Sequence, residues 1–89
     1  MQISVYDTYV QRPDGTRMHF DILVPSTVTD RETVLQYGQT YLGAKGLSCA
    51  DLKPEKCNFC HRETAAPEVQ QAIAESGFAI IEMEHCQPM

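Results

Sequence analysis

The stretch RMHFDILV, residues 17–24, has the clearest structural pattern in the chain. Every second residue in it is apolar: Met18, Phe20, Ile22 and Val24. The residues between them include three polar ones: Arg17, His19 and Asp21. Successive side chains of a strand point to opposite faces of the sheet, so this alternation predicts a strand with one face toward the core.

The preceding residues predict a partner for this strand. Residues 3–10, ISVYDTYV, are rich in β-branched and aromatic types, which favour strands, and Asp7 shares one face with Ile3, Val5 and Tyr9. Between the two segments, RPDG at 12–15 has proline and glycine where a turn needs a fixed φ and a permissive backbone. We therefore expect a β-hairpin.

Two helices and one more main strand are predicted downstream. Thr29-Asp30-Arg31-Glu32 matches a capping box, with the Thr hydroxyl and the Glu carboxylate bonding backbone donors, and predicts a helix to about Leu42. An apolar stripe predicts a second helix over 65–76, and Gly77 suits the position just past its end. Residues 78–84, FAIIEME, alternate as a strand does.

The segment between the helices has less pattern. LSCA, residues 47–50, is consistent with a short strand, whereas 51–63 contain Pro54 and no clean period, which predicts a structured loop. The fold class expected is α+β, a two-layer sandwich of order β-β-α-(short β)-α-β. Its helices would pack on one face of a mostly antiparallel or mixed sheet, in a single domain over 1–89.

Composition narrows the function. Twelve acidic and seven basic residues give a net charge of -5, which disfavours nucleic acid and anionic membranes as partners. The amino terminus lacks a basic leader and a long apolar run, so we expect a cytoplasmic protein whose thiols stay reduced. A disulfide framework among the four cysteines, Cys49, Cys57, Cys60 and Cys86, is then not expected.

The motif CNFCH, residues 57–61, suggests a metal site. A chain reversal at Gly77 would return the carboxy-terminal residues to the start of the second helix, next to this motif. Three thiols and two imidazoles would then meet, and zinc favours four such donors in a tetrahedron. The predicted metal ligands are Cys57, Cys60, Cys86 and either His61 or His85.

Other interpretations of CNFCH remain open. Lys56 and Arg62 flank it and would favour a reactive thiolate, although a redox motif normally opens a helix. The match to a haem attachment signal is expected to be accidental, because that attachment normally follows export. Adjacent Cys60 and His61 are not expected to face each other, so no hydrolase, and no other reaction, is assigned.

A function of another class is an interaction domain with incidental cysteines, forming a homodimer or binding a protein partner through an exposed strand edge. In this interpretation CNFCH carries no chemistry. His19 and Asp21 are interpreted as solvated surface residues and receive no role.

Five segments together carry a resemblance: VYDTYV at 5–10, MHFDIL at 18–23, CNFCH at 57–61, APEVQQAI at 66–73 and GFAIIEMEHC at 77–86. In combination they resemble DUF2024, a family of small uncharacterised bacterial proteins, over nearly the whole chain. The resemblance implies a compact α+β fold and a cytoplasmic bacterial origin. It implies no activity, substrate or site residue.

Overall fold

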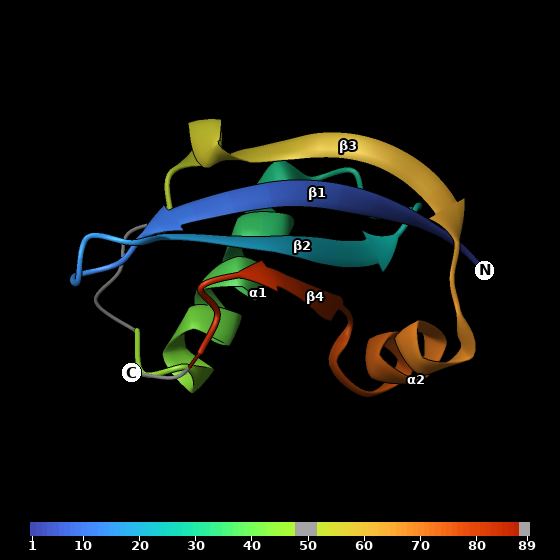
Figure 1. The fold of residues 1–89 in the computed structure, drawn as a ribbon. Helices are drawn as coiled ribbons and strands as arrows, with labels where there is room; N and C mark the ends of the chain where they lie inside the picture. Colours follow the sequence, from blue (N-terminus) through green and yellow to red (C-terminus); the bar gives the residue numbers. More distant parts are fainter. Residues whose placement is uncertain (48–51, 88–89) are drawn as a thin grey trace.

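The computed structural model describes residues 1–47 and 52–87. Its sheet contains β1 (Gln2–Gln11), β2 (Arg17–Pro25), β3 (Cys57–Thr64) and β4 (Ala79–Glu84), all antiparallel, in the spatial order β3-β1-β2-β4 (Figure 1). The helices are α1 (Arg31–Ala44) and α2 (Pro67–Ser76), and a 3-10 turn, η1 (Pro54–Lys56), precedes β3. The predicted α+β class and element order are confirmed.

The β1–β2 hairpin forms where it was predicted. Its turn closes with hydrogen bonds from Arg12 N to Thr16 O, 2.8 Å, and from Gly15 N to Arg12 O, 3.0 Å. Gly15 has a φ of 90°, a left-handed conformation that glycine adopts without strain. The turn fixes the register, and with it the residues that face each other across the two strands.

The main core lies between α1 and one face of the sheet. Phe20, fully buried, is at its centre, with Ile22 and Val24 beside it and Val34 and Leu42 from α1 above. The helix begins one residue later than the predicted capping box implies. Asp30, and not Thr29, is the N-cap, and its carboxylate accepts hydrogen bonds from Glu32 N at 3.1 Å and from the Thr33 hydroxyl at 3.0 Å.

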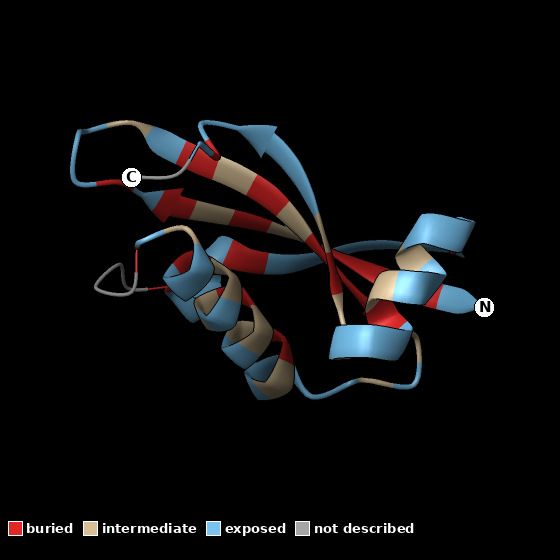
Figure 2. Ribbon diagram, turned by 90° about the horizontal axis from the view of Figure 1, so that it is seen from below, coloured by how far each residue is buried: buried red, intermediate tan, exposed pale blue. Residues whose placement is uncertain are grey.

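The second helix packs on the opposite face of the sheet, which corrects the prediction that both helices share one face. Leu23, next to Ile22 along β2, belongs to a second cluster with Ile3, Val5 and, from α2, Ile73. Neighbouring strand residues point to opposite faces, so the two clusters must lie on opposite sides. Figure 2 shows α2 at the end of the sheet near the amino terminus, so the rest of this face is left without a helix.

The segment expected to be a loop contains a strand. CNFCHRET, residues 57–64, is β3 and pairs with β1. Seven of its eight residues are exposed, so an edge strand of this kind shows no alternation of apolar and polar residues in the sequence. The short strand predicted at 47–50 lies mostly outside the described residues, and Leu47, which is described, is buried and not in a strand.

No helix in the described part of the chain is both long and apolar enough to cross a membrane.

Candidate functional site

The five predicted metal ligands do not come together. Cys57, Cys60 and His61 lie on β3, whereas His85 and Cys86 follow β4, and β3 and β4 are the two opposite edges of the sheet. Three strand spacings of about 4.8 Å separate the edges by roughly 14 Å. The predicted convergence is wrong because β4 leads away from α2 and pairs with β2, while β3 pairs with β1.

Two of the three sulfurs belong to the core on the α1 side. The Cys57 thiol accepts a hydrogen bond from the Thr8 hydroxyl at 3.6 Å, and burial raises its pKa. The Cys86 thiol donates to the carbonyl oxygens of His19 and Glu84, both at 3.3 Å. These contacts give both residues a packing role.

Cys60 and His61 face each other after all, because β3 contains a bulge opposite Val5 and Tyr6. His61 Nδ1 lies 3.2 Å from Cys60 Sγ, and His61 Nε2 lies 2.7 Å from Glu63 Oε1. Desolvation, and then the charges of Asp7 and Asp21, raise the pKa of Cys60, which favours the thiol over the nucleophilic thiolate. Cys57 and Cys60 are roughly 10 Å apart along the strand, too far for a disulfide.

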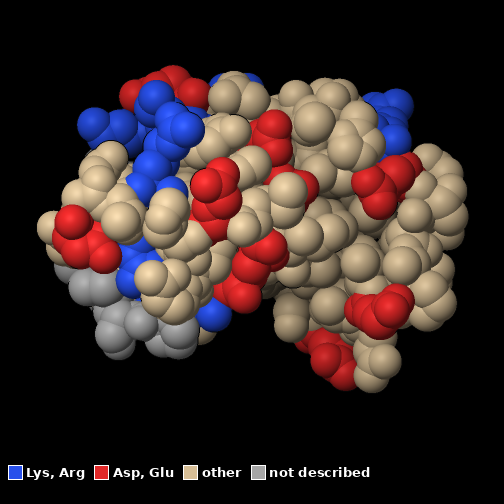
Figure 3. Space-filling model, in the orientation of Figure 1, with Lys and Arg blue, Asp and Glu red and all other residues tan. Residues whose placement is uncertain are grey.

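A different cluster occupies the uncovered part of the sheet face opposite α1. Asp7 on β1 is directly across from Asp21 on β2, and His19 lies two residues away on the same face. His19 Nε2 is 3.3 Å from Asp7 Oδ1 and 3.9 Å from Asp21 Oδ1. The three atoms that could bind a metal ion all lie within 4.8 Å of one another. Acidic side chains gather at the centre of this face in Figure 3.

The two carboxylates perturb each other. Burial, together with hydrogen bonding to Asp7 and the charge of Asp7, raises the pKa of Asp21 to about 6. The hydrogen bond from Asp21 lowers the pKa of Asp7. When both are ionised, two like charges face each other across the strands, which is destabilising. Asp21 Oδ1 is buried and has no hydrogen-bond partner among the described residues.

Neighbouring groups hold the His19 ring in place. The Tyr9 ring stacks on it with centroids 4.3 Å apart, and the Arg17 guanidinium lies 4.7 Å from the centroid of the Tyr9 ring. The His19 backbone is tied to Cys86 by the thiol hydrogen bond. Only 16% of the His19 side chain and 15% of the Asp21 side chain are exposed, so these groups lie in the sheet surface and are not solvated like ordinary surface residues.

This cluster was not predicted from the sequence, although a signal was present. From the sequence alone, His19 and Asp21 are interpreted as surface residues and Asp7 as one polar residue on an apolar face. A tight turn over 12–15 pairs Arg12 with Thr16, and counting back along both strands places Asp7 opposite Asp21. Two aspartates directly opposite each other, beside a histidine, are costly enough to indicate a site.

We expect the stability of the protein to fall as pH rises from about 4 to about 6. The folded-state pKa of Asp21, about 6, is above its usual value of 3.8, so the folded protein holds a proton that the unfolded chain releases in this window. The stabilisation that this bound proton provides is fully present below pH 3.8 and is lost as pH rises above about 6. Two pKa units correspond to about 3 kcal/mol, and solvent screening reduces the expected change to about 1 kcal/mol.

The pH dependence is measured by urea unfolding of metal-free protein at several pH values. Asp21→Asn is the reference, because it removes the titrating group and keeps the shape. A difference between wild type and variant that stays constant from pH 4 to pH 6 would contradict the raised pKa of Asp21. Asp7, whose pKa is lowered, loses its contribution only as pH falls below its usual value of 3.8, outside this window.

Comparison with known proteins identifies the family. The chain is similar to protein NE1680 from Nitrosomonas europaea, whose NMR structure matches with 41% sequence identity and a TM-score of 0.85, over 98% of this chain and 100% of that one. No curated protein matches the chain. The family model for DUF2024, a domain of unknown function, matches residues 1–83. The chain therefore belongs to the DUF2024 family.

Proposed function

We propose that this protein is a metal-binding module that holds one zinc ion on the open face of its sheet, through Asp7, His19 and Asp21. The observation that carries the proposal is the buried Asp21 Oδ1, which has no hydrogen-bond partner among the described residues and lies 3.9 Å from His19 Nε2. A buried carboxylate oxygen without a hydrogen-bond partner is costly, and a cation between Asp21 and Asp7 would remove that cost.

The geometry fits zinc in part. Zinc binds imidazole nitrogen and carboxylate oxygen at about 2.0–2.1 Å, so two ligand atoms of a tetrahedral site are about 3.3 Å apart. The observed separation of His19 Nε2 and Asp7 Oδ1 is 3.3 Å, and that of His19 Nε2 and Asp21 Oδ1 is 3.9 Å. Zinc binding would therefore require Asp21 Oδ1 to move about 0.6 Å closer to His19 Nε2.

The site is open to solvent on one side. Asp7 is the most exposed of the three ligands, with 39% of its side chain accessible, so a fourth position remains for water. Three protein ligands with one open position is the arrangement of catalytic zinc sites, in which the ion makes its bound water more acidic. Zinc is not needed to form the core, because neither apolar cluster includes these three side chains.

His61 is the predicted metal ligand best placed to assist this site. It lies within electrostatic reach of both Asp7 and Asp21 from β3, although its effect on the pKa of either carboxyl is smaller than those of burial and of the two aspartates on each other. Its ring is held by Cys60 and Glu63. We propose that His61 adjusts the affinity of the site from outside the first ligand shell, in a cytoplasmic protein whose thiols remain reduced.

A second candidate function is self-association through β3. This edge strand has seven exposed residues of eight, and Phe59 is 50% exposed on it. An exposed strand edge carries unpaired backbone donors and acceptors that a second copy can pair with. A homodimer would then form a continuous sheet across the two β3 strands.

Native mass spectrometry of the protein after addition of zinc tests both candidates. We expect one zinc ion per 10.0 kDa chain, lost in His19→Ala and kept in Cys60→Ser. Zinc that persists in His19→Ala, or disappears in Cys60→Ser, would overturn the proposed ligand set. A species of twice the chain mass would support the dimer, and its loss on adding a charge at Phe59 (Phe59→Glu) would locate the contact on β3.

A further inference from the structure

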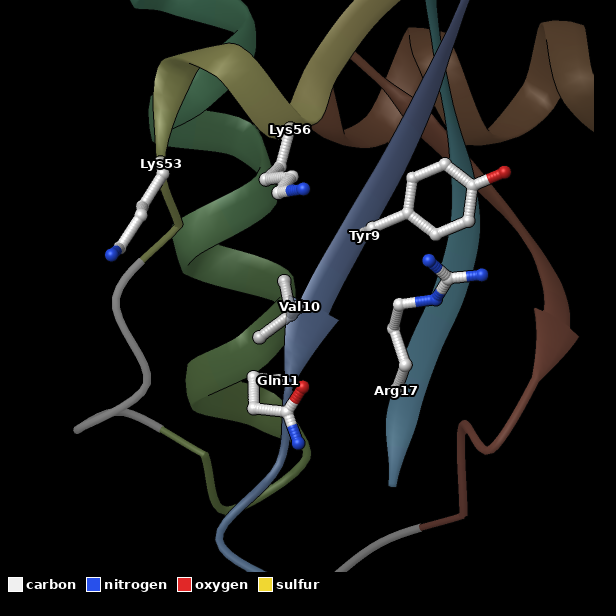
Figure 4. A pocket seen from close by; sticks show the side chains of 6 residues that line it. All are labelled: Tyr9, Val10, Gln11, Arg17, Lys53 and Lys56. Atoms are coloured by element: carbon white, nitrogen blue, oxygen red, sulfur yellow. The ribbon is translucent and has the colours of Figure 1, made fainter. Parts of the chain in front are cut away.

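A pocket of about 450 Å³ lies at the hairpin end of the sheet, away from α2 (Figure 4). Its lining residues come from the two hairpin strands and from the segment around η1: Tyr9, Val10, Gln11, Arg17, Lys53 and Lys56. This volume falls within the range of small-molecule sites. The pocket shares no residue with the Asp7, His19 and Asp21 cluster but adjoins it, because its lining residue Tyr9 stacks on the His19 ring.

The pocket exists because β1 extends further than its neighbour β3. The last residue of β1 that pairs with β3 is Thr8, opposite Cys57, and η1, which precedes β3, lies near β1 without pairing with it as a strand. Among the described residues, the β1 edge at 9–11 therefore has no strand beside it on the β3 side. Such an edge presents backbone N–H groups that can bind an acceptor.

The charge of the pocket is opposite to that of the protein. Three of the seven basic residues line it, and no acidic residue does, although the chain has a net charge of -5. Within residues 1–47 and 52–87, neither Arg17 nor either of the two lysines has a carboxylate within ion-pair distance. Three cations around one pocket make its electrostatic potential positive, and such a potential attracts an anion.

We propose that this pocket binds the phosphate group of a small phosphate monoester. The Arg17 guanidinium can donate to two phosphate oxygens at once, and Lys53 and Lys56 supply two further positive charges for a dianion. Lys56 extends from η1 toward Tyr9, and Arg17 lies beside the Tyr9 ring (Figure 4). Tyr9 and the buried Val10 provide an aromatic and an apolar surface for the rest of the ligand.

The test is an NMR titration of metal-free, isotope-labelled protein with phenyl phosphate, with phenol as the uncharged control. We expect phenyl phosphate to shift the backbone amides of residues 9–11, 17, 53 and 56, and phenol to leave them unchanged. Lys53→Gln/Lys56→Gln is expected to weaken binding about tenfold, since two charge-assisted contacts are lost. Metal is absent, so the result does not depend on the zinc proposal.

A matched control separates a site from general charge attraction. Arg31→Gln/Arg62→Gln removes the same two charges from exposed positions outside the pocket and is expected to change the affinity less than about twofold, because solvent and salt screen such distant charges. Equal weakening in both double variants would overturn the proposal. So would equal shifts with phenol, or the absence of any shift with phenyl phosphate.

Discussion

Replacing Asp21 with asparagine is expected to weaken zinc binding about a hundredfold while making the metal-free protein more stable. The substitution keeps the shape of the side chain and removes its negative charge, so the ion loses a carboxylate ligand; a hundredfold change corresponds to about 2.7 kcal/mol. In the metal-free protein, the same change removes the cost of burying a carboxylate at this position and the repulsion between Asp7 and Asp21, which together raise the pKa of Asp21. We expect a gain of about 1 kcal/mol at pH 7.

Calorimetric titration gives the zinc affinity, and urea unfolding in the presence of a chelator gives the stability. Glu75→Gln, an exposed carboxylate on α2, makes the same change of charge away from the site and should alter neither quantity. Opposite signs for binding and stability are the pattern of a site that is strained in the absence of its ligand. A variant that binds zinc as tightly as the wild type would remove Asp21 from the ligand set.

Replacing Phe20 with alanine is expected to destabilise the protein by about 3–5 kcal/mol, the largest effect on stability that we expect from one substitution. Phe20 is fully buried at the centre of the α1 side of the sheet and packs against the Tyr41 ring, with centroids 4.7 Å apart. A domain of this size has a total stability of about 5–15 kcal/mol, so the variant should be close to unfolding at room temperature. Urea unfolding measures the loss.

Ile81→Ala is the matched control for this prediction. Ile81 is an apolar residue on the same sheet, but 42% of it is exposed on the edge strand β4. Its truncation leaves little cavity and should cost less than about 1 kcal/mol. Phe20 lies between His19 and Asp21 on β2, yet it points to the other face. If the two variants were equally stable, the core would not be where the structure places it.

The hairpin and both helices follow from local patterns, and these parts of the fold were predictable. The alternation of apolar and polar residues in β2 indicates one buried face. Gly77, with a φ of 88°, ends α2 at the position that the sequence indicates. The positions of the helices were not predictable in the same way. One signal for them was present: Ile22, Leu23 and Val24 form a continuous apolar run, which is typical of a strand covered on both faces. All three residues are fully buried in the structure.

The predicted metal site failed because it depended on strand order. The sequence shows that CNFCH precedes α2 and that β4 follows it, but not which strand each would pair with. Pairing of β3 with β1 and of β4 with β2 moves the two groups of ligands to opposite edges. The Asp7, His19 and Asp21 cluster depends only on the hairpin register, a local feature, and so it was within reach of the sequence.

X-ray absorption at the zinc edge tests the central claim most directly, because it reports the atoms bound to the metal. For wild-type protein carrying one zinc ion, we predict a first shell of nitrogen and oxygen only, at about 2.0–2.1 Å, with no sulfur. That spectrum would change in His19→Ala and persist in Cys57→Ser and Cys60→Ser. A sulfur shell at about 2.3 Å would contradict the account and return the site to the cysteines.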